Sequence, residues 1–230
     1  MCLPGARRTI ACLALGLGLL AAAPEGLRAG APDPWALCAE HAGAAARRSG
    51  LPHHLLGAIA KVEAGRWNAA EGAVIAWPWT VTAEGRGRYL PSRAAALAEV
   101  RTLRARGLSN IDVGCLQVNL RYHPEAFASL EDAFDPARNA AYAAGYLARL
   151  RQETGSWTTA IGRYHSRTPR LSGPYRLKVF RAWREARRQA DRARIAAKPP
   201  AGTQPSSRPQ AAPGQIARRH ALASGLPLRP

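Results

Sequence analysis

The signals that start and stop helices constrain this chain more than any other feature of its sequence. Pro52 and Pro136 stand at first-turn positions, Ser92 precedes a third segment as a capping residue, and Gly50 and Gly65 end the first two apolar periods. Six segments carry a helical apolar period, at residues 35–49, 52–64, 92–106, 136–153, 157–164 and 175–194. We therefore expect one mainly helical domain.

One stretch interrupts the helical pattern. Residues 77–90 place β-favouring side chains, Trp79 to Thr82 and then Tyr89, on both sides of the glycine-containing turn at residues 84–87. This arrangement predicts a small β-hairpin inserted into the helical domain. The expected fold class is α+β, predominantly α-helical.

Residues 1–31 have the layout of a secretory signal peptide. Arg7 and Arg8 precede an apolar run at residues 10–23, and small residues follow at 29–31. The alternative is a membrane anchor, but the run is shorter than the ~20 apolar residues that span a bilayer. We expect export to the periplasm, with no transmembrane segment after the signal is removed.

The carboxyl end has a different composition. Residues 198–230 are Pro, Ala, Gln, Ser, Arg and Gly without an apolar period, so they cannot offset the entropy of ordering. The folded domain is expected at 34–190, followed by a disordered basic Pro/Ala-rich tail at 191–230. Of the net charge of +18, +10 lies on residues 32–190, so the domain itself should attract polyanions.

Two cysteines, Cys38 and Cys115, remain once a signal peptide holding Cys2 and Cys12 is removed. In an oxidising compartment such a pair favours one disulfide. Closing the long loop between them would stabilise the fold by about 4 kcal/mol. Two buried free thiols are the alternative.

A single carboxylate falls on the apolar face of the second predicted helix. Glu63 stands four residues after Ile59 and seven after Leu56. Lost hydration raises the pKa of such a group above ~4.3, and the helix dipole acts in the same direction, so the group can donate a proton near neutral pH. The alternative is a surface glutamate paired with Lys61 or Arg66.

Four short stretches carry a resemblance when they are taken together. They are residues 58–65 around Glu63, residues 114–119 (GCLQVN), Asn139 with residues 145–147, and residues 160–166. In order and spacing they resemble the motifs of the family 1 soluble lytic transglycosylases, over about residues 38–188. The stretch at 77–80 is similar to a subgroup of short periplasmic members. The resemblance implies a lysozyme-like domain.

The resemblance also implies roles for single residues. Glu63 matches the family's catalytic glutamate, Gln117 matches the glutamine that lines the cleft, and Tyr164 matches the tyrosine that steadies the acid and the sugar. Trp79, together with Trp77 and Tyr164, would offer flat faces to sugar rings, although aromatic residues also serve as core.

This chain departs from the family pattern at three positions. The family's serine after the glutamate is Ala64, its methionine before the glutamine is Leu116, and its asparagine after the tyrosine is His165. Ser166 or a hairpin residue is expected to supply the missing hydroxyl. His165 is interpreted as a neutral hydrogen-bonding substitute, with a pH-sensitive group as the alternative.

The implied substrate is the glycan strand of peptidoglycan. Most glycosidases use two carboxylates, whereas the matched motifs contain one, so Glu63 would act as acid and then as base while the muramic C6 hydroxyl closes a 1,6-anhydro ring. No cofactor is implied. Endolytic or exolytic action, and a role in growth, in recycling or at a secretion or flagellar apparatus, stay open.

Two other classes of function compete with this interpretation. The Arg-rich segment 176–194 and the charge of the domain favour a polyanion binder without catalysis. The export signal and the lack of a recognised binding motif argue against nucleic acid as its partner. A zinc enzyme would need His53, His54, His123 and His165, but adjacent histidines do not share a helix face and no compact ligand motif is present.

Overall fold

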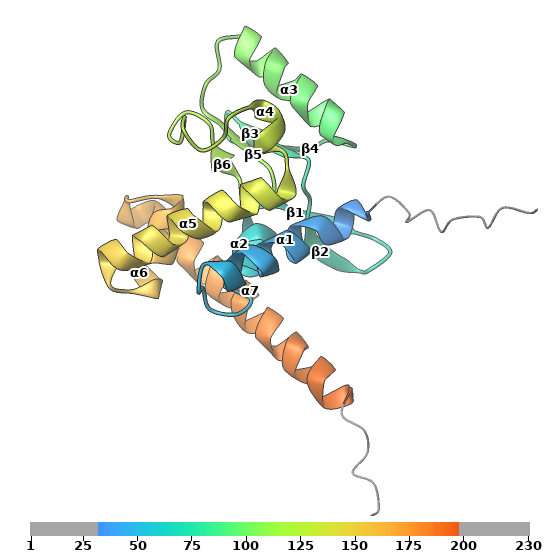
Figure 1. Ribbon diagram of the computed structural model, residues 1–230, viewed down its shortest axis with the longest axis vertical. Coiled ribbons are helices and arrows are strands. Elements are labelled where there is room, and N and C mark those ends of the chain that lie inside the picture. The colour runs from blue at the N-terminus through green and yellow to red at the C-terminus, as the bar shows by residue number, and fades with distance from the viewer. Residues whose placement is uncertain (1–31, 198–230) are drawn as a thin grey trace, which may run out of the picture.

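The computed structural model describes residues 32–197 (Figure 1). The predicted fold class is confirmed: the described chain is a predominantly α-helical α+β fold. The predicted signal peptide and residues 198–230 of the predicted tail lie outside the described residues, whereas residues 191–196, which were assigned to the tail, are helical. The elements in chain order are α1 Pro34–Arg48, α2 Leu55–Ala64, β1 Gly65–Asn68, β2 Ala73–Ala76, β3 Thr80–Ala83, β4 Arg86–Tyr89, α3 Arg93–Ala105, β5 Ile111–Val113, β6 Val118–Asn119, α4 Leu130–Ala133, α5 Pro136–Thr154, α6 Trp157–His165 and α7 Pro169–Ala196.

Most helix ends follow the capping chemistry of the sequence. Ser92 caps α3 by accepting a hydrogen bond from the Ala95 backbone N–H, and Asp135 caps α5 through the backbone N–H of Arg138. The start of α2 differs from the expectation, as does the start of α7, described below. Helix α2 begins at Leu55 rather than at residue 52, because the preceding residue, His54, takes a left-handed conformation with φ 65°.

Helix α7 is longer than the sequence pattern predicts. It begins at Pro169, six residues before the expected start, and continues through Pro174 to Ala196. A proline inside a helix removes one backbone donor, which is why the pattern alone favours a start after it. The buried residues Tyr175 and Val179 hold this helix against the domain. In Figure 1 its carboxyl half projects from the body of the molecule.

The predicted hairpin is formed by β3 and β4, with Thr80 opposite Tyr89. Its turn residues Glu84 and Gly85 both have positive φ, as tight hairpin turns require. β3 also pairs with β5, and β5 pairs with β6, so the sheet is antiparallel with the order β4-β3-β5-β6. The separate hairpin of β1 and β2 was not predicted, nor were β5, β6 and α4.

The described chain has two hydrophobic cores. Helices α1, α2, α5, α6 and α7 surround the first, which is built on residues such as Leu55, Ile59 and Leu147. The sheet packs on α3 around the second, with Val81 and Val100 fully buried. We call these two parts the helical half and the β-rich half; in Figure 1 the β-rich half lies above α5, and α1 and α2 of the helical half lie below it.

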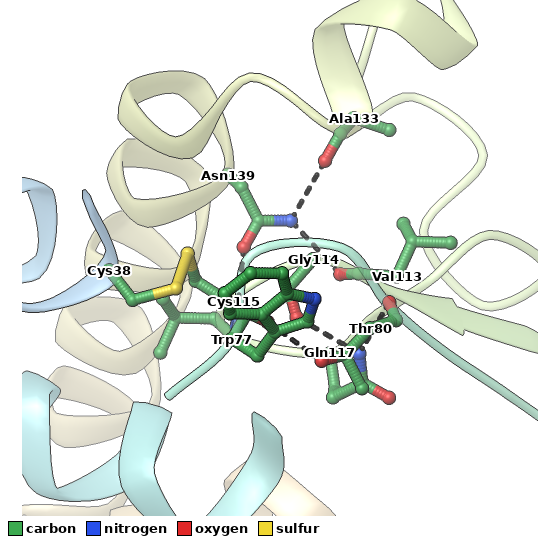
Figure 2. The surroundings of a disulfide bond; sticks show 10 residues. Cys38, Trp77, Thr80, Val113, Gly114, Cys115, Gln117, Ala133 and Asn139 are labelled. Atoms are coloured by element: carbon green, nitrogen blue, oxygen red, sulfur yellow. Dashed lines mark hydrogen bonds between the residues drawn. A yellow bond between two sulfur atoms is a disulfide. The ribbon is translucent and has the colours of Figure 1, made fainter. Parts of the chain in front are cut away.

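A disulfide joins the two halves (Figure 2). Cys38 of α1 is bonded to Cys115, which lies in the turn between β5 and β6, and their Cα atoms are 5.4 Å apart. The predicted pairing is therefore confirmed. Beside it the buried Asn139 accepts a hydrogen bond from the Leu116 N–H and donates to the carbonyls of Val113 and Ala133. This turn is consequently held from two sides.

Candidate functional site

A cleft of about 830 Å³ lies between the helical half and the β-rich half. Five of the residues singled out from the sequence line it, namely Glu63, Gln117, Tyr164, His165 and Ser166. Its remaining lining comes from β3, β5, β6 and the loop after it, α5, α6, the start of α7 and the segment that joins these last two helices. This volume is in the range of small-molecule and oligosaccharide sites.

Glu63 is placed in the cleft by the abrupt end of α2. The next residue but one, Gly65, starts β1, and a Cβ there would collide with the carbonyl oxygen of Lys61 and with Val74. The helix can therefore end one residue after Glu63 only because position 65 is a glycine. The Glu63 side chain is left partly exposed to the cleft.

The surroundings of Glu63 favour its protonated form. Burial raises the pKa of Glu63 to about 7, and the negative charge of Asp112 raises it as well. The Tyr175 hydroxyl and the Lys178 ammonium act against this by favouring the charged form. A carboxyl group with a pKa near 7 can both give up and take back a proton at neutral pH, which general acid–base catalysis requires.

Two tyrosines stand next to Glu63, the half-buried Tyr164 and the buried Tyr175. The Tyr164 hydroxyl donates to the Leu116 carbonyl oxygen at 2.9 Å, so this ring is fixed to the turn that carries the disulfide. Tyr175 approaches the Glu63 carboxyl closely enough to lower its pKa, yet the two groups are not in hydrogen-bond geometry. Within residues 32–197 the Tyr175 hydroxyl has no other partner. It is therefore able to donate to Glu63 once Glu63 is ionised.

A second carboxylate, Asp112, lines the same cleft from β5. Burial raises its pKa, while the Asn119 amide, which donates to Asp112 Oδ1 at 2.8 Å, lowers it. The sequence analysis did not select Asp112, although it lies only two residues before Gly114 in a matched motif. Its alternation with buried Ile111 and Val113 is the signal that could have found it.

Gln117 lines the cleft, but its amide is committed to the protein. Its Nε2 donates to the carbonyl oxygens of Thr80 and Gly114 at 3.1 and 2.9 Å, and its Oε1 accepts from the Thr82 hydroxyl at 2.6 Å. Its φ of 47° lies in the left-handed region, which costs about 1 kcal/mol or more for a residue other than glycine. Figure 2 shows this side chain reaching toward Thr80. Gln117 thus fixes the strand that carries Thr82.

His165 and Ser166 follow Tyr164 at the end of α6. The His165 ring stacks on Tyr175 with centroids 4.6 Å apart, and burial lowers the pKa of its imidazole, with a further contribution from Lys178. The Ser166 oxygen accepts a hydrogen bond from the Thr168 N–H at 3.0 Å, which leaves its own proton free to be donated. Both environments are compatible with neutral hydrogen-bonding roles.

The structure corrects the expectation for Trp79. Its side chain is buried in the second core and does not line the cleft, so it offers no open face to a sugar ring. Trp77 is buried as well, where it packs against Trp35 and carries the Arg66 guanidinium over its ring. These indole rings stabilise the base of the hairpin instead.

The aromatic wall of the cleft is made of other side chains. Tyr142 and Tyr146 stand one turn apart on α5, and the ring of Tyr146 lies 5.7 Å from that of Tyr164. His123 completes the wall; its Nδ1 is 2.8 Å from the Tyr142 hydroxyl, and burial lowers its pKa. Tyr142 and Tyr146 both fall within the apolar period of the helix predicted at residues 136–153. One turn of spacing on a helix does not distinguish a core face from a cleft face.

The histidines of the zinc alternative are not gathered in one place. His53 and His54 border a separate small pocket between α1 and α2, whereas His123 and His165 line the cleft. Among residues 32–197 no group of three or more histidine, cysteine or acidic side chains is arranged to hold a metal ion. In the same range no helix combines the length and the apolar character that a membrane span needs.

We compared the chain with known protein families, curated proteins and solved structures. No family model, curated protein or solved structure matches the chain. The function therefore has to be argued from the cleft itself.

Proposed function

We propose that this chain is an exported peptidoglycan lytic transglycosylase with a lysozyme-like domain. One observation carries the proposal: Glu63 stands in an open cleft with its pKa raised to about 7. The wall of tyrosines beside it supports a carbohydrate substrate, because flat rings pack against the apolar faces of sugars. The identity of the substrate rests on the resemblance of the sequence motifs, which implies the β-1,4-linked strand of N-acetylmuramic acid and N-acetylglucosamine.

In the first step Glu63 gives its proton to the oxygen that bridges the two sugars. The bond between that oxygen and C1 of the muramic residue breaks, and its electron pair stays on the oxygen. The acetamido group of the same muramic residue supports the positive charge at C1. Tyr175 is placed to donate to the carboxylate that forms on Glu63.

In the second step Glu63 acts as a base. Its carboxylate takes the proton from the C6 hydroxyl of the muramic residue, and the C6 oxygen bonds to C1. The product is a 1,6-anhydro ring, and no water is consumed. This step regenerates protonated Glu63, so a single titrating carboxyl near neutral pH is sufficient for the cycle.

Asp112 favours a second candidate, hydrolysis of the same bond. Retaining and inverting glycosidases use a pair of carboxylates, and Asp112 shares the cleft with Glu63. In that case Asp112 would form a glycosyl intermediate, or activate a water molecule, and the products would carry reducing muramic ends.

Mass spectrometry of the soluble fragments that the mature protein releases from purified peptidoglycan tests the proposal. Fragments ending in 1,6-anhydromuramic acid are expected. Reducing muramic ends as the dominant product would replace the transglycosylase with the hydrolase. No released fragment at any pH from 5 to 8 would reject both.

Periplasmic action is part of the proposal. The disulfide between Cys38 and Cys115 supports it, because such bonds persist in oxidising compartments. Fractionation of cells that express the full chain, with mass determination of the mature protein, tests it. A cytoplasmic protein with an uncleaved amino terminus would reject export.

A further inference from the structure

Two arginines line the cleft. Arg163 lies on α6 one residue before Tyr164, and Arg167 lies just beyond the end of that helix; both line the cleft that contains Glu63. No other arginine or lysine lines it among the described residues. The cleft therefore has two carboxylates, Glu63 and Asp112, and a separate pair of guanidinium groups.

Neither of these two arginines forms a strong ion pair within residues 32–197. Arg163 is half-buried, yet within residues 32–197 it has no carboxylate within ion-pair distance. Arg167 approaches Glu153 at 3.7 Å, but both side chains are well exposed, and an exposed pair of this kind contributes little. A ligand anion could therefore engage both guanidinium groups at small cost.

The position of the arginines relates them to the sugar-binding wall. The charge of Arg167 is close enough to Tyr146 to lower the pKa of its hydroxyl, against the larger effect of burial. Arg163 is the neighbour of Tyr164, whose ring faces Tyr146. A sugar ring lying on these tyrosines would bring its substituents next to the two guanidinium groups.

A positive charge in the cleft would offset the repulsion between the two carboxylates that line it and an anionic substrate. An anionic substrate is repelled by Asp112 and by the ionised fraction of Glu63, so a strand that carries carboxylates needs compensation within the same cleft. Arginine suits the task, because its planar guanidinium forms two parallel hydrogen bonds to one carboxylate and keeps its charge at any physiological pH.

We propose that Arg163, assisted by Arg167, binds a carboxylate carried by the muramic residue of the strand, and so selects anionic strands over neutral β-1,4 sugars. This inference rests on the proposed function, since it takes the glycan strand as the ligand. The carboxylate has two sources with the same chemistry, the lactyl group of a muramic residue without its peptide and the acidic groups of an attached peptide.

The test measures binding in the inactive Glu63→Gln background by titration calorimetry. Three ligands are compared: glycan oligosaccharides with peptides attached, the same oligosaccharides after amidase treatment, which exposes the lactyl carboxylates, and neutral chitohexaose. Arg163→Gln is the test variant. Arg181→Gln is the matched control. This substitution removes the same charge, but Arg181 is exposed on α7 and lies outside the cleft.

We expect Arg163→Gln to weaken binding of an anionic ligand about tenfold and to leave chitohexaose unchanged. A loss confined to the peptide-bearing ligand assigns the carboxylate to the peptide, and a loss with the amidase-treated ligand assigns it to the lactyl group. Equal losses with all three ligands, no loss with any, or the same loss in Arg181→Gln would overturn the inference.

The outcome is independent of the reaction type. The end groups released by the unmodified protein decide between transglycosylase, hydrolase and neither, whereas the titrations use a variant without turnover. If the products carry anhydro ends but Arg163→Gln weakens binding of anionic and neutral ligands equally, only the role of Arg163 is rejected. Selective binding without any product would remove only the catalytic proposal.

Discussion

The helical half and the β-rich half each bring one carboxylate to the cleft, and the two are solvated differently. Glu63, at the end of a buried helix, has no hydrogen-bond donor in bonding geometry, and its pKa rises to about 7. Asp112, on a strand, receives the Asn119 amide, which opposes the effect of burial on its pKa. Burial raises the pKa of both groups, but only Asp112 has a hydrogen-bond donor in bonding geometry that opposes this shift.

This difference suggests that the two groups have separate tasks. Glu63 is suited to move a proton. Asp112, when ionised, raises the pKa of Glu63 through its negative charge. The predictions below alter one half, the link between the halves, or one carboxylate at a time.

The largest expected effect is on turnover in Glu63→Gln. This change keeps the shape of the side chain and removes the transferable proton, so the rate of fragment release should fall roughly 10²- to 10⁴-fold. Binding to peptidoglycan and the circular dichroism spectrum should be retained. Asn119→Asp, which removes the amide that bonds Asp112, is a useful companion variant from the other half. Near-normal turnover in Glu63→Gln would discard the assignment.

The link between the halves is tested by Cys38→Ser combined with Cys115→Ser. The bond closes a loop spanning 77 positions in the sequence, so its loss should lower the free energy of unfolding by about 4 kcal/mol. Denaturant titration of the oxidised protein and the double variant measures the difference. The folded fraction should keep its activity, because neither sulfur lines the cleft. An unchanged midpoint would show that the bond has no structural role.

The raised pKa of Glu63 also predicts a pH-dependent cost to stability. Between its ordinary value of 4.5 and about 7 the folded state binds more protons than the unfolded state, so stability falls as pH rises through this window. The full cost is about 3 kcal/mol above pH 7. Relative to the unmodified protein, Glu63→Gln should therefore gain stability from pH 5 to pH 8. A difference in melting temperature that is independent of pH would contradict this origin.

Asp112→Asn sharpens the contrast between the two carboxylates. If Asp112 acts only through its charge, fragment release should fall about tenfold or less, and the products should keep anhydro ends. Removing the charge should lower the pKa of Glu63, so that kcat/KM begins to fall at a lower pH. A loss as large as that of Glu63→Gln, together with reducing ends from the unmodified protein, would identify Asp112 as the second group of a hydrolase.

The smallest effect is expected from Tyr175→Phe. The hydroxyl favours ionised Glu63, so its removal should raise the pKa of Glu63 and move the fall of kcat/KM to higher pH. At pH 6, where Glu63 is mostly protonated in both proteins, the first step should change less than threefold. Tyr142→Phe is the matched control, because Tyr142 bonds His123 and not Glu63. A shift to lower pH in Tyr175→Phe would reverse the assigned role.

The sequence was a good guide where short-range chemistry decides. The capping residue Ser92 and the first-turn Pro136 predicted the starts of α3 and α5 to within a residue, and the glycine turn predicted the hairpin of β3 and β4. The position of Glu63 on an apolar face predicted the direction of its pKa shift. Each of these inferences needs only the residues within one or two helical turns.

It was a poorer guide where distant segments meet. Trp79 was expected to offer a flat face to a sugar and lies in the core, whereas Tyr142 and Tyr146, which belong to the apolar period at 136–153, line the cleft. A side chain's own segment does not reveal which neighbour covers it. β6 has only two residues, too few for an alternating pattern to be recognised.

What the sequence determined by itself is the six longer helices, the hairpin of β3 and β4, and the presence of a carboxylate with a raised pKa, because backbone propensity, capping and apolar periodicity are local. What only the tertiary structure decided is which side chains surround that carboxylate. Asp112 of β5 and Arg163 of α6 line the cleft that contains Glu63, and Tyr175 of α7 is buried beside the Glu63 carboxyl. Burial and electrostatic interaction depend on distance in space, which the order of residues along the chain does not give.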